Sequence, residues 1–382
     1  MGWRRRPRRQ GLEKRMHLLA RAASVIVVAF GIAAGSAGVA AASTGDMGFM
    51  VGGPLPQPLP STTAGGPFAT LMGGSPIRYQ RIGVAWDQFG TWNGSRCVSP
   101  TQTGSEASTF TGDVAKAKQL GQVPLLVVGP DIWGATSGYQ WPARAQTAPT
   151  PTDQQYTCGV QLLLKTLKSQ RLAQTGMPVE AFNEPDNSSY YVDPSQAGRY
   201  FGDLVAAGGS QVHAIAGVFE SAWDETYATT YVNAVKSSGH NGSATSWSVH
   251  DYNDVVDGQT VQSCSPSNLS ACDHRSVSEF LAWLQRQGEP TSDVWVTEAG
   301  DASVGGAWLT HSRSEEANAA YGWEQLRSYA AHTFWYQWQT FSGDGWDSAL
   351  IDSSGQPRPS YCVIAYGETP AQALSDSRCP GS

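Results

Sequence analysis

Positive charge is scarce in this chain once its first 42 residues are set aside. The whole sequence holds 25 Lys and Arg against 32 Asp and Glu, but eight of the basic residues and one of the acidic ones precede position 43. Residues 43–382 therefore carry 17 basic and 31 acidic side chains, a net charge of −14. Because so acidic a surface repels nucleic acid and anionic membranes, we expect neither as a partner.

Several motifs of common enzyme classes are also missing. There is no Gly-x-Ser-x-Gly, which argues against a serine hydrolase with a nucleophile elbow, and no His-Glu-x-x-His, which argues against a zinc protease. No close Cys-x-x-Cys or Cys/His cluster occurs, so we expect no metal site. We expect no cofactor either.

A long hydrophobic run is lacking too, because the apolar segment from Ala22 to about Ala34 is short and rich in Gly and Ala. It follows a basic stretch and precedes Ala40-Ala41-Ala42, so residues 1–42 are predicted to be a signal peptide. Met16 is a possible alternative start, and the sequence leaves Sec and twin-arginine export open. A secreted, extracellular protein is therefore expected, with no membrane attachment after cleavage.

The six cysteines all follow this segment, and an even count in an exported chain predicts disulfides. Six cysteines allow 15 pairings. Nearness in sequence favours the pairs 97–158, 264–272 and 362–379. No Pro/Ser-rich linker divides residues 75–382, so residues 43–382 are predicted to form one domain.

Short apolar runs alternate with helical patterns along this domain. Strands are expected at 47–51, 79–86, 123–128, 178–182, 213–219, 246–249, 293–297 and 333–338, and helices at 67–72, 113–120, 154–171, 195–208, 228–237, 276–287 and 314–331, with Ser195 as a helix cap. About eight strand-helix units predict an α/β protein of the (β/α)8, or TIM, barrel class. The alternative, an open doubly wound sheet, would need a Gly-rich phosphate turn after an early strand, and none is present.

Two glutamates lie at matching ends of predicted strands. Glu184, in Asn183-Glu184-Pro185, follows the fourth strand, and Glu298 ends the seventh. They are 298 − 184 = 114 residues apart, or three units of 38, which suits a barrel of this length. Strands four and seven lie on opposite sides of such a barrel, so the carboxylates of Glu184 and Glu298 can face each other across its open end. Two such carboxyl groups can have different roles in one reaction: one protonates the oxygen of the leaving group, and the other attacks the carbon to which that oxygen is bonded.

These residues resemble the pattern of the clan A glycoside hydrolases, retaining barrels with Asn-Glu-Pro at the end of strand four and Glu at the end of strand seven. The pattern is nearest to the style of families 39 and 5. The resemblance implies that Glu184 is the acid/base, that Asn183 binds the sugar 2-hydroxyl and that Glu298 is the nucleophile. It also implies a carbohydrate substrate.

The resemblance extends to other strand ends between about 80 and 340. Arg81, five residues before Trp86, is similar to the strand-two arginine of these barrels, and His250-Asp251-Tyr252 is similar to their strand-six His-x-Tyr. Tyr252 would then donate to Glu298. We expect Trp338, on strand eight, to form the floor of the sugar site, and Arg81, Trp86, His250 and Tyr252 to belong to the same substrate-binding site.

Each of these side chains also has a purely structural interpretation. Arg81 could form an ion pair inside the barrel, His250 and Tyr252 could be polar strand ends, and Trp86 and Trp338 could be packing residues. Glu220, after strand five, is a rival carboxylate without the Asn-Glu-Pro setting. The sequence predicts a secreted retaining glycosidase, with a catalytically inactive carbohydrate-binding barrel as the alternative. The sequence identifies neither the sugar that is recognised nor the oligomeric state of the protein.

Overall fold

The computed structural model describes residues 46–50, 77–99, 105–130, 150–188, 191–221, 223–238, 244–255, 277–301, 312–339 and 348–381. The predicted signal peptide, the helix expected at 67–72 and the cysteine pair 264–272 lie outside these ranges. Within them, no helix is long and apolar enough to cross a membrane.

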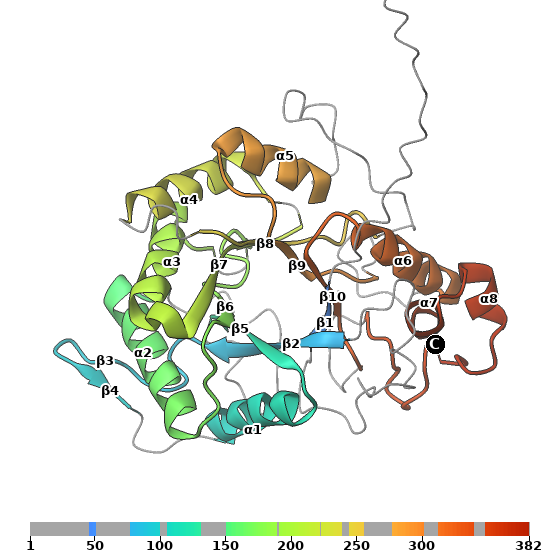
Figure 1. The fold of residues 1–382 in the computed structure, drawn as a ribbon, viewed down its shortest axis with the longest axis horizontal. Coiled ribbons are helices and arrows are strands. Elements are labelled where there is room, and N and C mark those ends of the chain that lie inside the picture. The colour runs from blue at the N-terminus through green and yellow to red at the C-terminus, as the bar shows by residue number, and fades with distance from the viewer. Residues whose placement is uncertain are drawn as a thin grey trace, which may run out of the picture. The chain divides into compact units, whose positions relative to one another are not determined.

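Eight parallel strands close into a barrel in the order β1-β10-β9-β8-β7-β6-β5-β2, with helices around the outside of the ring (Figure 1). They are β1 (Asp46–Met50), β2 (Ile77–Ala85), β5 (Val123–Gly129), β6 (Met177–Glu180), β7 (Val212–Phe219), β8 (Trp247–His250), β9 (Val294–Glu298) and β10 (His332–Tyr336). Taken in chain order, these are barrel strands one to eight. The predicted (β/α)8 fold is confirmed.

The helices are α1 (Ser105–Gln119), α2 (Asp153–Ser169), α3 (Pro194–Gly208), α4 (Glu225–Ser237), α5 (Val277–Gln287), α6 (Arg313–Leu326), α7 (Pro359–Tyr366) and α8 (Pro370–Ser375). A 3-10 turn, η4 (Gly209–Gln211), follows α3, and β3 (Thr91–Trp92) pairs antiparallel with β4 (Cys97–Val98). The predicted cap Ser195 is wrong. Asp193 caps α3 instead, because its carboxylate accepts the Ser195 and Gln196 backbone N–H groups while Pro194 takes the first helical position.

The barrel has two apolar layers. The larger one lies between strands and helices, where residues such as Leu126 and Val128 of the apolar run in β5 are buried. A smaller cluster of Tyr79, Leu125, Ile215, Trp295 and Phe334 fills the barrel interior. Gly48 makes room for it, since a Cβ there would lie 2.3 Å from the Phe334 ring. Strands buried on both faces are expected to be almost wholly apolar, as β5 is.

Two of the three predicted cysteine pairs are confirmed. Cys97 joins Cys158, with Cα atoms 5.5 Å apart, and so ties β4 to α2. Cys362 joins Cys379, with Cα atoms 6.1 Å apart, and so fastens α7 to the segment after α8. Both spans are in the usual range for a disulfide.

Candidate active site

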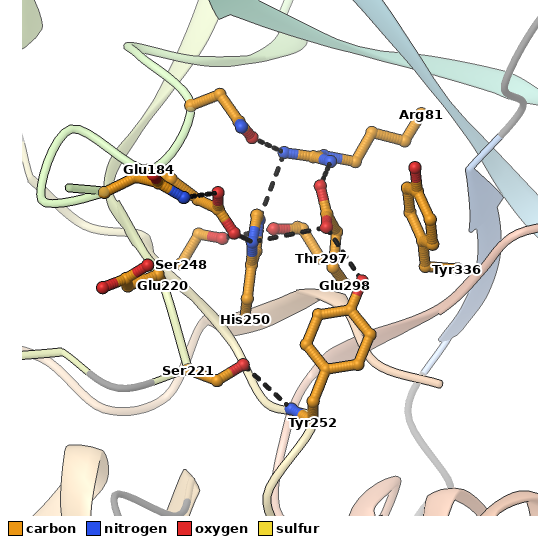
Figure 2. A network of polar contacts seen from close by, with 12 residues as sticks. Arg81, Glu184, Glu220, Ser221, Ser248, His250, Tyr252, Thr297, Glu298 and Tyr336 are labelled. Atoms are coloured by element: carbon orange, nitrogen blue, oxygen red, sulfur yellow. Dashed lines mark hydrogen bonds and ion pairs between the residues drawn. The ribbon is translucent and has the colours of Figure 1, made fainter. Parts of the chain in front are cut away.

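Arg81 is the cation around which the polar side chains of the barrel mouth are arranged (Figure 2). It is fully buried in β2, two residues beyond Tyr79 of the interior cluster. Its Nε donates to Glu180 Oε2 at 2.7 Å, its Nη1 to Glu298 Oε1 at 2.5 Å and its Nη2 to Asn183 Oδ1 at 2.8 Å. One guanidinium therefore connects strands two, four and seven, and Arg81 forms both an ion pair inside the barrel, with Glu180, and an ion pair with Glu298.

Replacing Arg81 by methionine is expected to destabilise the protein by about 3–5 kcal/mol, because the buried Glu180 and Glu298 would lose their shared cation. Denaturant unfolding monitored by tryptophan fluorescence measures the change. The matched control is Arg78→Met on the same strand, whose exposed side chain should cost less than about 1 kcal/mol. Equal losses in the two variants would contradict this account of Arg81.

Glu184 lies in the turn that follows β6, four residues beyond its last residue, Glu180. The turn is held by two backbone hydrogen bonds to the neighbouring strands, from Asn183 N–H to Val128 O at 2.8 Å and from Glu184 N–H to Val218 O at 2.9 Å. Glu184 has a φ of 38°, a left-handed conformation that is unfavourable for a residue with a Cβ. The neighbouring strands therefore hold the acid in a position that the local sequence alone would not favour.

Both oxygens of each catalytic candidate are held. Glu184 Oε1 lies 2.7 Å from His250 Nδ1, and its Oε2 accepts from Asn187 Nδ2 at 2.9 Å. Glu298 Oε1 accepts from Arg81, and its Oε2 accepts from Tyr252 Oη at 3.0 Å. The two side chains are 16% and 10% exposed, so each carboxyl is fixed yet reachable.

His250, which ends β8, lies between the two carboxylates (Figure 2). Its Nδ1 is also 3.5 Å from Glu298 Oε2, while its Nε2 lies 3.3 Å from Arg81 Nη2. Burial disfavours the imidazolium, but the negative charges of Glu298 and Glu184 outweigh it and raise the pKa of His250. Because Arg81 can only donate, the hydrogen bonds are satisfied when Nε2 carries a lone pair and Nδ1 carries the proton.

The gap between the two carboxyl groups is short. A carboxylate oxygen of Glu184, one of Glu298 and a ring nitrogen of His250 all lie within 4.8 Å of one another. Such a cluster could by spacing alone share a metal ion, but the Arg81 guanidinium already bonds Glu298 and contacts His250, and its charge disfavours a second cation. Carboxyl groups about 5–5.5 Å apart are typical of retaining glycosidases, whereas inverting enzymes need about 6.5–9.5 Å.

The structure thus brings together Arg81, Asn183, Glu184, His250, Tyr252 and Glu298. The other two predicted site residues, Trp86 and Trp338, lie in the buried apolar cluster between strands and helices. Trp86 follows β2 and is buried in the apolar core. Trp338 is 5% exposed and packs edge-on against Phe49 and Tyr361, with ring centroids 5.5 and 6.0 Å away.

Several residues of the network were not predicted, among them Ser248, which donates to Glu180, and Thr297, which lies 2.6 Å from the Ser248 hydroxyl. Glu180 and Asn187 hold Arg81 and Glu184 respectively. Tyr336, the last residue of β10, stands beside Arg81 and Glu298 in Figure 2, with its ring 6.4 Å from that of Tyr252. Strand alternation was the available signal, because Tyr336 shares the inner face with Phe334.

Glu220, the rival carboxylate, follows β7 and lies beside Glu184 (Figure 2). Partial burial, and then the charge of Glu184, raise the pKa of Glu220 from 4.5 to about 7. The carboxyl is therefore half protonated near neutral pH.

This pKa predicts a pH-dependent stability. An unfolded Glu220 loses its proton near 4.5 and the folded one near 7, so the folded state binds more protons between these values and stability falls as pH rises through that window. Glu220→Gln should melt like wild type at pH 4 and be more stable at pH 8 by about 1 kcal/mol, a value reduced for solvent screening. The same stability difference at both pH values would contradict the shift.

The fold and the paired glutamates define a (β/α)8 barrel with two carboxyl groups at the ends of strands four and seven. No protein-family model matches the chain, and no curated protein sequence does. Several solved structures, in contrast, are similar to the chain.

The chain is similar to a family 39 glycoside hydrolase from the gut symbiont Bacteroides cellulosilyticus WH2, at 19% identity over 84% of this chain and 62% of that one, with a TM-score of 0.51. It is similar to a monomeric beta-xylosidase from Caulobacter crescentus CB15, at 15% identity over 76% of this chain and 61% of that one, with a TM-score of 0.51. It is also similar to a glucosidase from Croceicoccus marinus, at 12% identity over 85% of this chain and 67% of that one, with a TM-score of 0.55.

At these identities the likeness shows the fold. The resemblance predicted from the motifs is confirmed at that level, since the structural neighbours include family 39 glycoside hydrolases. The chain spans about three fifths of the length of the first two structures.

Proposed function

We propose that this protein is a secreted retaining glycoside hydrolase that cleaves O-glycosidic bonds in polysaccharides or oligosaccharides by double displacement. The observation that carries the proposal is the pair of glutamates at the ends of strands four and seven, with carboxylate oxygens within 4.8 Å. That spacing leaves room for a sugar carbon but not for an intervening water, as a covalent intermediate requires.

Glu298 is the proposed nucleophile. Its Oε2, which Tyr252 reaches and which lies nearest His250, attacks the anomeric carbon, while Arg81 holds Oε1. The positive guanidinium keeps the carboxylate ionised and oriented, and both hydrogen bonds fix it for attack.

Glu184 is the proposed acid/base. In the first step it gives its proton to the leaving oxygen as Glu298 bonds to carbon; in the second it takes a proton from water, which displaces Glu298 and releases the sugar. His250 and Asn187 hold its two oxygens, so the same carboxyl keeps one position through both steps.

Asn183 is the proposed partner of the substrate 2-hydroxyl. Its Oδ1 accepts from Arg81, which assigns the amide orientation and presents its nitrogen as the donor. Trp86 and Trp338 are proposed to contact the sugar through their rings. Tyr336, which lies beside Glu298 in Figure 2, is a third aromatic residue proposed for that role.

Secretion and an extracellular carbohydrate substrate are part of the same proposal. The predicted signal peptide, the two disulfides and the net charge of −14 after residue 42 support it.

A panel of aryl glycosides and polysaccharides tests the proposal. We expect hydrolysis of at least one member, with the first sugar released in the anomeric configuration of the substrate, as followed by proton NMR. Inverted product would overturn the retaining mechanism. Binding of polysaccharide without any turnover would instead support the inactive carbohydrate-binding barrel.

A further inference from the structure

Glu220 owes its place beside Glu184 to a distortion of β7. Gly217 has a φ of 87° and Val218 a φ of 60°, and the pairing with β8 shifts register between Gly217 and Phe219. A left-handed backbone is rare for a β-branched residue, and such bulges typically re-aim a side chain at a functional edge.

Hydrogen bonds then tie the end of β7 to the turn that carries Glu184. Glu184 N–H donates to Val218 O at 2.9 Å, and Glu220 N–H donates to Asp186 Oδ1 at 3.0 Å. The two segments therefore hold Glu220 and Glu184 at a set separation.

The Glu220 carboxyl has no hydrogen bond or ion pair with any residue of the described part of the chain. Asp186 Oδ2 is likewise buried without a hydrogen-bond partner among the described residues. Partly buried polar groups normally have partners, so the unpartnered Glu220 carboxyl beside Glu184 is suited to substrate hydroxyls.

The side of the site on which Glu220 lies indicates which part of the substrate it would meet. Figure 2 shows Glu220 on one side of His250 and Glu184, with Glu298 and Tyr336 on the other. The sugar that becomes bonded to Glu298 occupies the second side. The leaving group carries the oxygen that Glu184 protonates, so it extends toward Glu220.

An exposed aromatic ring lies near Asp186, whose carboxylate accepts the Glu220 N–H. Tyr191 is 55% exposed, and its ring packs edge-on against Tyr227, whose hydroxyl donates to Val192 O at 2.8 Å. Asp186 is close enough to act on Tyr191, since burial and then the charges of Asp193, Asp224 and Asp186 raise the pKa of the phenol. A supported ring with an open face suits the C–H face of a sugar.

The geometry points to Glu220 and Tyr191 as a binding site for the leaving-group sugar, one that accepts neutral or amino sugars and rejects uronic acids. The carboxyl would accept hydrogen bonds from sugar hydroxyls, and the ring would stack on the sugar. Four acidic side chains gather here, namely Asp186, Asp193, Glu220 and Asp224. Burial raises the pKa of Asp186, so the negative charge here comes from Asp193, Asp224 and the ionised fraction of Glu220, and it repels a uronate. This inference rests on the proposed function because it takes Glu184 as the acid.

The test compares an oligosaccharide with an aryl glycoside that carries the same glycone, identified by the panel above. In Glu220→Ala, the ratio of oligosaccharide to aryl kcat/KM should fall about tenfold, because the aryl group offers no hydroxyls to this site. In Tyr191→Ala, kcat/KM for the oligosaccharide should fall about tenfold, because the sugar loses the ring on which it stacks. Glu315→Ala and Tyr321→Ala, which alter an exposed acid and an exposed ring of α6, serve as matched controls. An unchanged ratio in Glu220→Ala, together with an unchanged oligosaccharide kcat/KM in Tyr191→Ala, would overturn the inference.

Charge selectivity is tested by adding glucose, glucosamine or glucuronate to the aryl glycoside reaction. Transfer moves the glycosyl group from Glu298 to an acceptor hydroxyl, whose proton goes to Glu184. Glucose and glucosamine should yield transfer product at least tenfold faster than glucuronate, and Glu220→Gln should narrow that gap severalfold. Equal transfer to all three sugars would also overturn the inference. A wild type that hydrolyses no member of the panel would overturn the proposed function, and this inference with it.

Discussion

Replacing Glu298 by alanine is expected to abolish turnover of every substrate, with kcat/KM falling on the order of 10⁵-fold. The loss should not depend on the leaving group, because without the carboxylate no covalent intermediate forms. The fold should survive, since Arg81 keeps its hydrogen bonds to Glu180 and Asn183. Initial rates on aryl glycosides and a thermal melt measure the two effects separately.

Adding azide to the Glu298→Ala variant provides a second test of the nucleophile. The alanine variant leaves space beside the Arg81 guanidinium and Tyr252, where a small anion can take the place of the carboxylate. Azide should therefore restore part of the turnover of an activated aryl glycoside in Glu298→Ala. Glu225→Ala, which removes a partly exposed glutamate of α4 that is ion-paired with Arg286, should keep wild-type rates with or without azide. Undiminished hydrolysis in Glu298→Ala would refute the assignment of the nucleophile.

The barrel strands could be predicted because each is a short apolar run with few alternatives. Residues 123–129 show this best, since strands buried on both faces must be apolar throughout. The ends of the helices were harder to predict than the strands. The prediction began α1 near Asp113, whereas the helix begins at Ser105, because its first turns are small and polar and gain stability from packing rather than from an apolar repeat. Asp193 was passed over as a cap because Pro194 hid the helix start.

The members of the site could be predicted where a strand end coincided with a chemical residue. Glu184 and Glu298 stood out by their matched positions, and their contacts with His250 and Tyr252 follow from barrel geometry. Glu180 was missed although it is a charged residue inside an apolar strand, a pattern that requires a buried counter-ion such as Arg81.

Long-range geometry was beyond the sequence. The left-handed turns at Glu184 and Val218 depend on hydrogen bonds between neighbouring strands, and no local residue preference encodes them. β10 ends at Tyr336, which stands beside Arg81 and Glu298 in Figure 2, and the expected Trp338, two residues further on, packs against Phe49 and Tyr361. Strand alternation alone does not choose between these two aromatic residues.

Replacing Glu184 by alanine is expected to give a loss that depends on the leaving group. Natural glycosides, which leave as poorly stabilised alkoxides, should lose about 10³–10⁴-fold in kcat/KM, whereas aryl glycosides with acidic phenols should lose less than about tenfold. The reason is that an acidic phenol departs without a proton. Removal of the base also slows the second step, so the glycosyl-enzyme should accumulate on Glu298 and be visible as a mass increase on the intact protein. A series of aryl glycosides with graded phenol pKa values measures the dependence.

The same series separates Glu184 from its neighbour Glu220. Both are partly buried carboxyls at adjacent strand ends, and the raised pKa of Glu220, about 7, would also suit an acid catalyst. Only Glu184, however, is bonded to His250, which lies 3.5 Å from Glu298 Oε2, and so only Glu184 shares a fixed geometry with the nucleophile. Leaving-group dependence should therefore appear in Glu184→Ala and be absent across the aryl series in Glu220→Ala. If the dependence appeared in Glu220→Ala instead, Glu220 would be the acid and the distorted end of β7 would be part of the catalytic machinery itself.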